Sequence, residues 1–250
     1  MLLTLLAAAF EIVTVAQNPF GLAIGPDGAL YICEVGAHAI TRYDFTTRKK
    51  SVFVHGNEPY ELLFDTFGAL LYVDRLEHTV RRVDLANGEN RVLLGEGLNQ
   101  PHALAWNSNG QLLICDTSNN RVVELDPATG KHHEWAKYRG ARTFTKDARG
   151  NLYLALREGN AIMMIDGRTG EAARVASVGP KGMAWARDGS IYLADTENHR
   201  ITRLNPKTGA ITTVLEGLKR PHGVLVHDGW LYIGDSENNR VLRMRLPAAD

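Results

Sequence analysis

The chain has 250 residues, of which 44% are hydrophobic and 22% are charged. Its 28 basic and 28 acidic residues cancel to a formal net charge of zero, whereas nucleic-acid-binding domains are usually strongly basic. No apolar run reaches the roughly 18 residues that a membrane-spanning helix needs. The composition therefore argues against a nucleic-acid partner and against a membrane span.

The first nine residues, MLLTLLAAA, form an apolar leader. They resemble the apolar region and small-residue cleavage site of a secretory signal, but they lack a positive segment and are shorter than the usual roughly 15 to 30 residues. Two interpretations stay open, a truncated signal of an exported, periplasmic protein or an apolar leader on a cytoplasmic one.

A unit of about 40 residues then recurs six times, which is the sequence signature of a repeat architecture. Each unit has an apolar run, a turn that ends in glycine, and further short runs rich in Val, Ile, Leu and Tyr, a composition typical of strands. Helical spacing is absent. The turn glycines are Gly28, Gly68, Gly110, Gly150, Gly189 and Gly229.

The expected strands follow one another in the same order in every unit. The first strand ends at the glycine turn, and the second strands are 29–34, 69–74, 111–116, 151–156, 190–195 and 230–235. The third strands are 39–44, 79–84, 121–126, 161–166, 200–205 and 240–245. A fourth strand follows in five units, at 50–56, 91–97, 131–137, 172–178 and 211–217. Units of four short strands at this spacing predict the blades of a β-propeller.

The sixth unit ends near Leu246 without a fourth strand. FEIVTVAQ, residues 10–17, stands before Asn18-Pro19 just as ITTVLEG stands before the corresponding proline, Pro221. We therefore expect the N-terminal strand to complete the last blade, because ring closure removes exposed strand edges. The prediction is an all-β, six-bladed propeller of four-stranded antiparallel blades at 10–246, with a leader at 1–9 and a tail at 247–250. We expect a monomer.

Two segments, GMAWARDGSIYLADTENHRITRLN (182–205) and GVLVHDGWLYIGDSENNRVLRM (223–244), resemble NHL repeats. The resemblance covers essentially residues 10–246. It implies a six-bladed propeller similar to bacterial NHL proteins and to the gluconolactonase-like superfamily. It is less specific for function, because one fold hosts many sites.

In such a propeller the first strand of each blade lines the central channel, so the residue after the repeat proline should lie at one mouth of that channel. We call these six residues the mouth ring. They are Phe20, Tyr60, His102, Arg142, Lys181 and His222.

His102 and His222 are three repeats apart, so they should face each other across the axis. Neutral imidazole is a common metal ligand and titrates near neutral pH, which predicts either a divalent metal, zinc or calcium, or an acid–base pair. The resemblance implies acidic and amide metal ligands at this ring position in gluconolactonase-like enzymes, and histidines at comparable places in the amidating and streptogramin lyases. This ring has neither Asp, Glu nor Asn, and Arg142 and Lys181 repel cations. The alternative is that each histidine fills the mouth and bonds a backbone group.

Arg142 and Lys181 lie on adjacent blades and predict a clamp for a carboxylate or phosphate, because guanidinium is a planar fork for such anions. Tyr60 can donate to the same ligand, Phe20 belongs to the same rim, and Arg157 adds a cation near Arg142. The alternative is a pair of solvated rim charges. Their partners would be Glu58, Glu61 or Glu158.

Two further columns suit the architecture of the repeat better than an active site. Acidic residues before tight turns commonly accept backbone N–H bonds, and three of them have an arginine five residues later. We call these positions the carboxylate column: Glu34, Asp74, Asp116, Leu156, Asp195 and Asp235. The turn column tolerates left-handed backbone and comprises His38, His78, Asn120, Asn160, His199 and Asn239. Cys33 and Cys115 are two blades apart, too far for a disulfide.

Three functions follow. The favoured one is a binding or scaffold protein that holds a small anionic molecule or a peptide at the mouth, with no firm cofactor. The alternative is a metal-assisted hydrolase or lyase of the gluconolactonase, streptogramin-lyase or amidating-lyase type. In that case His102 and His222 would hold the ion or act as base, and Tyr60 and Arg142 would orient the substrate. The neutral charge disfavours the third function, an RNA-binding NHL domain.

Overall fold

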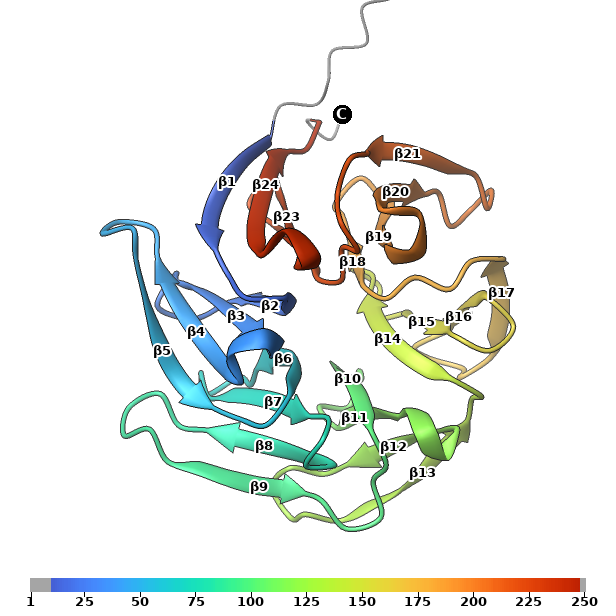
Figure 1. Ribbon diagram of the computed structural model, residues 1–250. Coiled ribbons are helices and arrows are strands. Elements are labelled where there is room, and N and C mark those ends of the chain that lie inside the picture. The colour runs from blue at the N-terminus through green and yellow to red at the C-terminus, as the bar shows by residue number, and fades with distance from the viewer. Residues whose placement is uncertain (1–9, 248–250) are drawn as a thin grey trace, which may run out of the picture.

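The structure, a computed structural model, describes residues 10–247. The predicted leader at 1–9 and residues 248–250 of the predicted tail lie outside the described residues. Six four-stranded antiparallel sheets surround a central axis (Figure 1). The predicted six-bladed propeller is therefore confirmed.

Each blade runs from an inner to an outer strand. The first three blades are β2(Pro19–Ile24), β3(Leu30–Glu34), β4(Ala39–Asp44), β5(Lys49–His55); β6(Pro59–Phe64), β7(Leu70–Asp74), β8(Thr79–Val83), β9(Asn90–Leu94); and β10(Pro101–Trp106), β11(Leu112–Asp116), β12(Arg121–Leu125), β13(His132–Lys137). The fourth and fifth are β14(Ala141–Lys146), β15(Leu152–Leu156), β16(Ala161–Ile165), β17(Ala172–Ala176); and β18(Met183–Trp185), β19(Ile191–Asp195), β20(Arg200–Leu204), β21(Ile211–Leu215). The sixth is β22(Val224–His227), β23(Trp230–Asp235), β24(Arg240–Arg245) and β1(Phe10–Val15).

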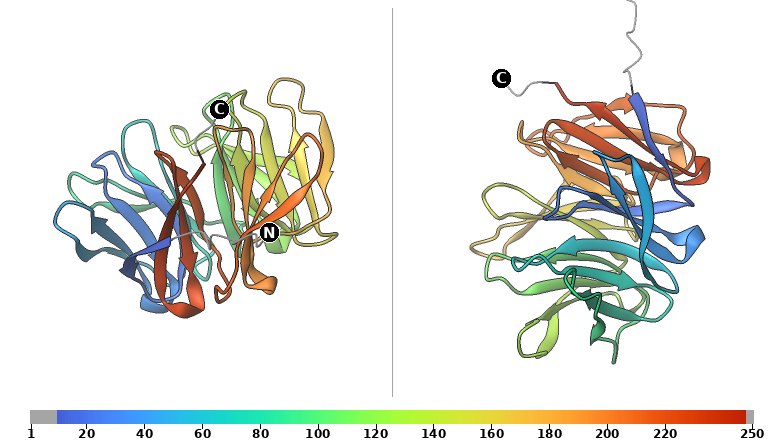
Figure 2. Two further views of the ribbon diagram at one scale, coloured as in Figure 1. Left: turned by 90° about the horizontal axis from the view of Figure 1, so that it is seen from above. Right: turned by 90° about the vertical axis from the view of Figure 1, so that its left-hand side faces the viewer.

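The N-terminal strand closes the ring as predicted. β1 pairs antiparallel with β24, from Phe10 opposite Met244 to Val15 opposite Arg240. Both ends of the described chain therefore belong to one blade (Figures 1 and 2). Lys50 of the first blade also holds β1 in place, because its Nζ donates to the carbonyl of Val15 at 2.7 Å.

The apolar core lies between adjacent blades rather than within one blade. Every residue of β3, β7 and β11 is buried. The buried apolar side chains form six clusters, and each cluster joins the facing surfaces of two adjacent blades. Burial on both faces of each sheet explains why these strands are almost continuously apolar.

The first strands approach one another closely around the axis. A β-carbon at Gly182 would lie 2.1 Å from the carbonyl oxygen of His222, and one at Gly223 would lie 1.8 Å from that of Phe20. Only glycine fits such an approach, so the residue after each of these ring positions is small to let the blades meet.

In the described part of the chain, helical structure is confined to single turns after four of the second strands. They are η1(Val35–Ala37), η2(Thr117–Asn119), η3(Thr196–Asn198) and η4(Ser236–Asn238). Within residues 10–247 no helix is long and apolar enough to cross a membrane. Each turn ends in a left-handed residue, as the turn column predicts, with φ of 51° at His38 and 57° at Asn120.

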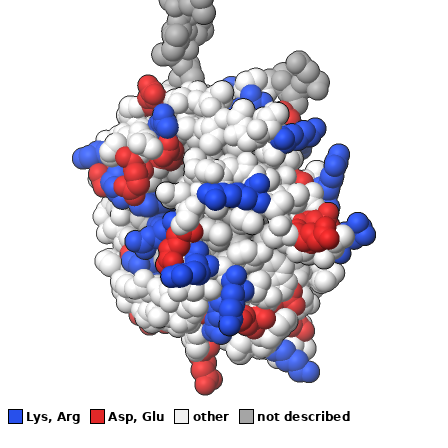
Figure 3. All heavy atoms as spheres, turned by 90° about the vertical axis from the view of Figure 1, so that its right-hand side faces the viewer, with Lys and Arg blue, Asp and Glu red and all other residues white. Residues whose placement is uncertain are grey.

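Charged side chains of both signs are interspersed over the side of the disc shown in Figure 3. Charged side chains of the protein form local pairs, such as Arg203 with Asp188 at 2.8 Å and Arg42 with Asp27 at 2.7 Å. Cys33 and Cys115 are both buried and free, in line with the absence of a predicted disulfide.

Candidate functional site

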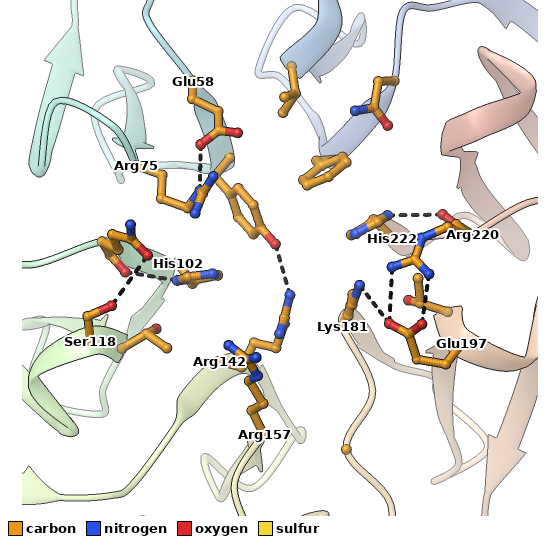
Figure 4. A pocket seen from close by; sticks show the side chains of 18 of the residues that line it. Glu58, Arg75, His102, Ser118, Arg142, Arg157, Lys181, Glu197, Arg220 and His222 are labelled. Carbon is orange, nitrogen blue, oxygen red and sulfur yellow. Dashed lines mark hydrogen bonds and ion pairs between the residues drawn. The ribbon is translucent and has the colours of Figure 1, made fainter.

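The six residues of the mouth ring line one cavity of about 600 Å³ at an end of the propeller axis. Figure 4 shows His102 and His222 on opposite sides of this cavity, with Arg142 and Lys181 along a third side. The cavity thus brings together every residue that the sequence assigned to a site. Arg157, on the neighbouring turn, also lines it.

A bulge at the start of the first strand directs these side chains. The register with the second strand shifts between Pro59 and Glu61 and between Pro101 and Leu104. Bulges commonly re-aim side chains next to functional sites. In three blades the residue before the proline is also left-handed, with φ of 49° at Asn18, 47° at Gln100 and 49° at Arg220. The repeat therefore encodes the placement of the ring, while the side chain at each position is free to vary.

Both histidines are held by a backbone carbonyl. The Nδ1 atom of His102 lies 2.8 Å from the Gln100 oxygen, and that of His222 lies 2.9 Å from the Arg220 oxygen. A carbonyl oxygen only accepts, so Nδ1 carries the proton and Nε2 is left with its lone pair. The backbone bond that the sequence offered as the alternative role of these histidines is therefore present. This bond uses only Nδ1, so Nε2 can still accept a hydrogen bond from a ligand.

Both imidazoles are neutral at ordinary pH. Burial, reinforced by the charge of Arg142, lowers the pKa of His102 to about 3. Burial, reinforced by Lys181, lowers the pKa of His222 to about 3 as well. A neutral imidazole whose Nδ1 donates to the backbone presents a hydrogen-bond acceptor to anything in the cavity.

Aromatic contacts join four of the six ring residues into one wall. Phe20 stacks on His222 with ring centroids 3.8 Å apart and planes 11° apart. Its edge meets Tyr60 at 4.8 Å, and Tyr60 meets His102 at 4.6 Å. Such contacts fix ring orientation as well as burying area, so this wall is aromatic, and Phe20 is its apolar member.

The opposite wall is cationic. Arg142 Nη2 donates to the Tyr60 hydroxyl at 3.1 Å, and the buried Nε of Arg142 has no hydrogen-bond partner among residues 10–247. Burial lowers the pKa of Lys181, whose ammonium pairs with Glu197 at 2.9 Å. Arg142 and Arg157 therefore have no carboxylate partner in the described part of the chain.

The carboxylates that the sequence offered as partners lie elsewhere. Glu58 pairs with Arg75, and Glu158 pairs with Arg139. Glu61 lies past the ring in the channel, where it lines a separate cavity of about 270 Å³. Within residues 10–247 the only hydrogen bond of its carboxylate is accepted from the N–H of Leu62, and burial raises its pKa to about 7. The interpretation of Arg142 as a rim charge paired with a glutamate is therefore wrong.

The donor set of the cavity does not fit a zinc or calcium ion. His102 and His222 are the only ring members of a ligand type, and a catalytic zinc usually takes three protein ligands. Arg142 and Lys181 stand between the two histidines in the ring, and their positive charges repel a cation. Across residues 10–247 no three His, Cys, Asp or Glu side chains are grouped to hold a metal.

The residues of the carboxylate column bond to nearby groups, as expected if their role is structural. Asp116 accepts the N–H of Asn99 at 2.7 Å and the Nε of Arg121 at 2.7 Å. Asp235 accepts the N–H of Lys219 and the Nε of Arg240 at the same distances. These carboxylates hold the blade together.

Sequence reasoning missed part of the cavity lining. Arg75 and Glu58 form an ion pair beside Tyr60, and Arg220 and Glu197 form another beside Lys181. The signal for Arg75 was present, because it occupies the same position of its repeat as Arg157, one residue past the second strand.

Comparison with known proteins agrees with the fold. The family model for the NHL repeat matches residues 98–125. A gluconolactonase of Zymomonas mobilis is 24% identical over 233 residues, which cover 75% of this chain and 63% of that protein. The chloroplastic protein SUPPRESSOR OF QUENCHING 1 of Arabidopsis thaliana is also 24% identical, over 79% of this chain and 21% of its own length. The chain thus spans less than two thirds of either relative.

Solved structures share the propeller. A gluconolactonase from Xanthomonas campestris superposes with a TM-score of 0.83 at 16% identity, covering 96% of this chain and 90% of its own. A catalytically inactive histidine-to-alanine variant of virginiamycin B lyase from Staphylococcus aureus, with quinupristin, gives 0.71 at 18% identity, covering 94% and 85%. The predicted likeness to NHL-repeat and gluconolactonase-like propellers is confirmed, and at these identities the solved structures establish the fold alone.

Proposed function

We propose that this propeller binds a small carboxylate-bearing molecule at the mouth of its channel. The observation that carries the proposal is the guanidinium of Arg142, which lies in the cavity with a buried, unbonded Nε and no carboxylate partner in the described chain. A guanidinium that lines a cavity without a carboxylate partner offers its N–H groups to a carboxylate as a planar fork.

The remaining groups of the cavity complement such a ligand. The Tyr60 oxygen accepts from Arg142, so its own proton is available for a ligand oxygen. The two Nε2 lone pairs accept from hydroxyl or N–H groups, and the Phe20 wall suits an apolar portion. A small carboxylate with one donor group and a short apolar part matches all of these surfaces.

Calorimetry with a panel of small carboxylates in low-salt buffer tests the proposal. We expect Arg142→Met to lower the affinity about 10- to 100-fold, because hydrogen bonds to charged groups contribute about 1.5 to 3 kcal/mol. Affinity should also fall as salt screens the charges.

Arg149→Met is the matched control, since Arg149 is exposed on a turn that does not line the cavity. Equal effects of the two substitutions, or no carboxylate binding by the wild type, would refute the proposal.

A hydrolase or lyase is the second candidate, and the paired neutral histidines favour it. Each Nε2 faces the cavity with its lone pair, which is the protonation state of a general base. Burial is the main cause of both low histidine pKa values, and a bound anion that offsets the charges of Arg142 and Lys181 raises them. The likeness to a gluconolactonase makes lactones the first substrates to assay. We expect His102→Gln or His222→Gln to lower kcat by at least about 100-fold, and absence of lactone turnover in the wild type would exclude that substrate class.

A further inference from the structure

Adjacent blades of this propeller are joined by side chains of the turn column. His78 Nδ1 accepts the N–H of Gln100 at 2.9 Å, and His199 Nδ1 accepts that of Arg220 at 3.1 Å. The amide oxygens of Asn120 and Asn239 accept in the same way from the next blade, at 3.0 and 2.9 Å. His38 contacts the carbonyl of Asn57.

Hydroxyl groups one residue past the second strand make a second type of link. Thr117 donates to the Ala141 oxygen at 2.6 Å, Thr196 to the Pro221 oxygen at 2.5 Å, and Ser236 to the Pro19 oxygen at 2.7 Å. Each bond ties one blade to the residue before the next ring position.

The junction between blades 4 and 5 lacks both links. Arg157 stands where the hydroxyl would be, and the amide of Asn160 makes no hydrogen bond within residues 10–247. Across the junction, the N–H groups of Val178 and Gly179 also have no partner in that part of the chain. Gly179 occupies the position at which Gln100 and Arg220 are left-handed, and it does not adopt that conformation.

This unlinked junction opens a groove of about 570 Å³. The groove and the mouth cavity share four lining residues, so they adjoin each other. These residues are Asn160, Gly179, Asp195 and Glu197. A β-carbon at Gly179 would lie 3.0 Å from the Asn160 amide oxygen and 3.1 Å from the Leu156 oxygen, so the glycine keeps the passage open.

The polar groups of the passage define what it can hold. Two unpaired N–H groups and one free carboxamide match a carbonyl and an N–H, which together make an amide. Asp195 and Glu197 are already paired with Arg200 and Lys181, so the passage offers no cation to a second acid. Val178, Leu193 and Ile211 line the groove farther out.

We propose that the ligand is an acylamino carboxylate, meaning a carboxylate with an amide next to it, whose acid lies at Arg142 and whose amide and tail lie in the groove between blades 4 and 5. This rests on the proposed function of the mouth. An N-acyl amino acid and the free C-terminal end of a peptide share this chemistry.

Four probes test the proposal by calorimetry: propionate, N-acetylalanine, acetyl-trialanine and the C-terminal amide of that tripeptide. We expect N-acetylalanine to bind at least tenfold more tightly than propionate, and the C-terminal amide not to bind. A further gain with acetyl-trialanine identifies peptide ends as the source, and no further gain identifies N-acyl amino acids.

Ser177→Trp fills the groove from its exposed rim, and Glu216→Trp is the matched control one residue past the outer strand of the next blade. The ratio of the propionate to the N-acetylalanine dissociation constant should fall to about one in Ser177→Trp and persist in Glu216→Trp. If propionate and N-acetylalanine bind the wild type equally well, the groove is not a subsite, although the mouth still binds carboxylates. If neither binds, both proposals fail.

Discussion

The mouth ring and the carboxylate column both recur in every blade, yet they differ in how their polar groups are satisfied. Asp116 and Asp235 are each bonded by a backbone N–H and an arginine of their own blade. In the ring, Arg142 reaches Tyr60, which lies 82 residues away along the chain, and one of its nitrogens has no partner within the described chain.

This difference separates structure from function in a repeat protein. A polar position whose partners come from the same repeat is satisfied in each copy and needs no ligand. A position whose residue type changes from blade to blade, and whose donors remain unpaired, does not serve the structure that all repeats share. Phe20, Tyr60 and Arg142 occupy equivalent positions with unrelated chemistry, which is expected where one composite site is assembled from several blades.

Removing a member of the carboxylate column should have the largest effect on stability. Asp116→Ala leaves the guanidinium of Arg121 and the N–H of Asn99 without their acceptor, and Asp116 is fully buried. Breaking a buried pair costs about 3 to 5 kcal/mol, and we expect about 3 because Arg121 is partly solvated. Urea unfolding measures this loss.

Arg142→Met is the comparison within the ring. It removes a charge whose Nε is unpaired, so it should leave the free energy of unfolding within about 1 kcal/mol of the wild type. If Arg142→Met destabilises the protein as much as Asp116→Ala does, the ring is structural and the contrast between the two sets of residues fails.

The sequence predicts the elements that every repeat shares. Alignment on the turn glycines locates the ring and the closing strand, because both depend on position within the repeat rather than on residue type. It cannot predict the contacts that cross the cavity. The pairing of Arg142 in blade 4 with Tyr60 in blade 2 depends on side-chain lengths and on the distance between blades.

The groove between blades 4 and 5 also lies beyond the reach of the repeat pattern. Asn160 fits the turn column as well as Asn120 does, so the sequence does not reveal that the side-chain amide of Asn160 is unbonded. The cause lies at Gly179, because glycine accepts many backbone conformations and the pattern does not select one. Arg157 is not a sufficient sign, because Arg75 occupies the same position in blade 2, whose His78 still bonds the next blade.

Acid should destabilise the protein through the ring histidines. The pKa of His222 is about 3 in the folded protein and has an ordinary value of 6.5, so below pH 6.5 the unfolded chain binds a proton that the native state does not. Stability therefore falls as the pH drops from 6.5 toward 3. At pH 5 this linkage amounts to about 2 kcal/mol for each histidine.

Glu61 acts in the opposite direction, because its raised pKa of about 7 makes the native state the better proton acceptor between pH 4.5 and 7. The net pH dependence of the wild type thus hides the histidine effect, and comparison with His222→Gln isolates it. Relative to the wild type, that variant should gain about 2 kcal/mol in unfolding free energy between pH 8 and pH 5. A constant difference across this range would mean that His222 protonates in place. The cationic wall and the burial would then not keep the imidazole neutral, and the site would lose the acceptor that distinguishes it from the carboxylate column.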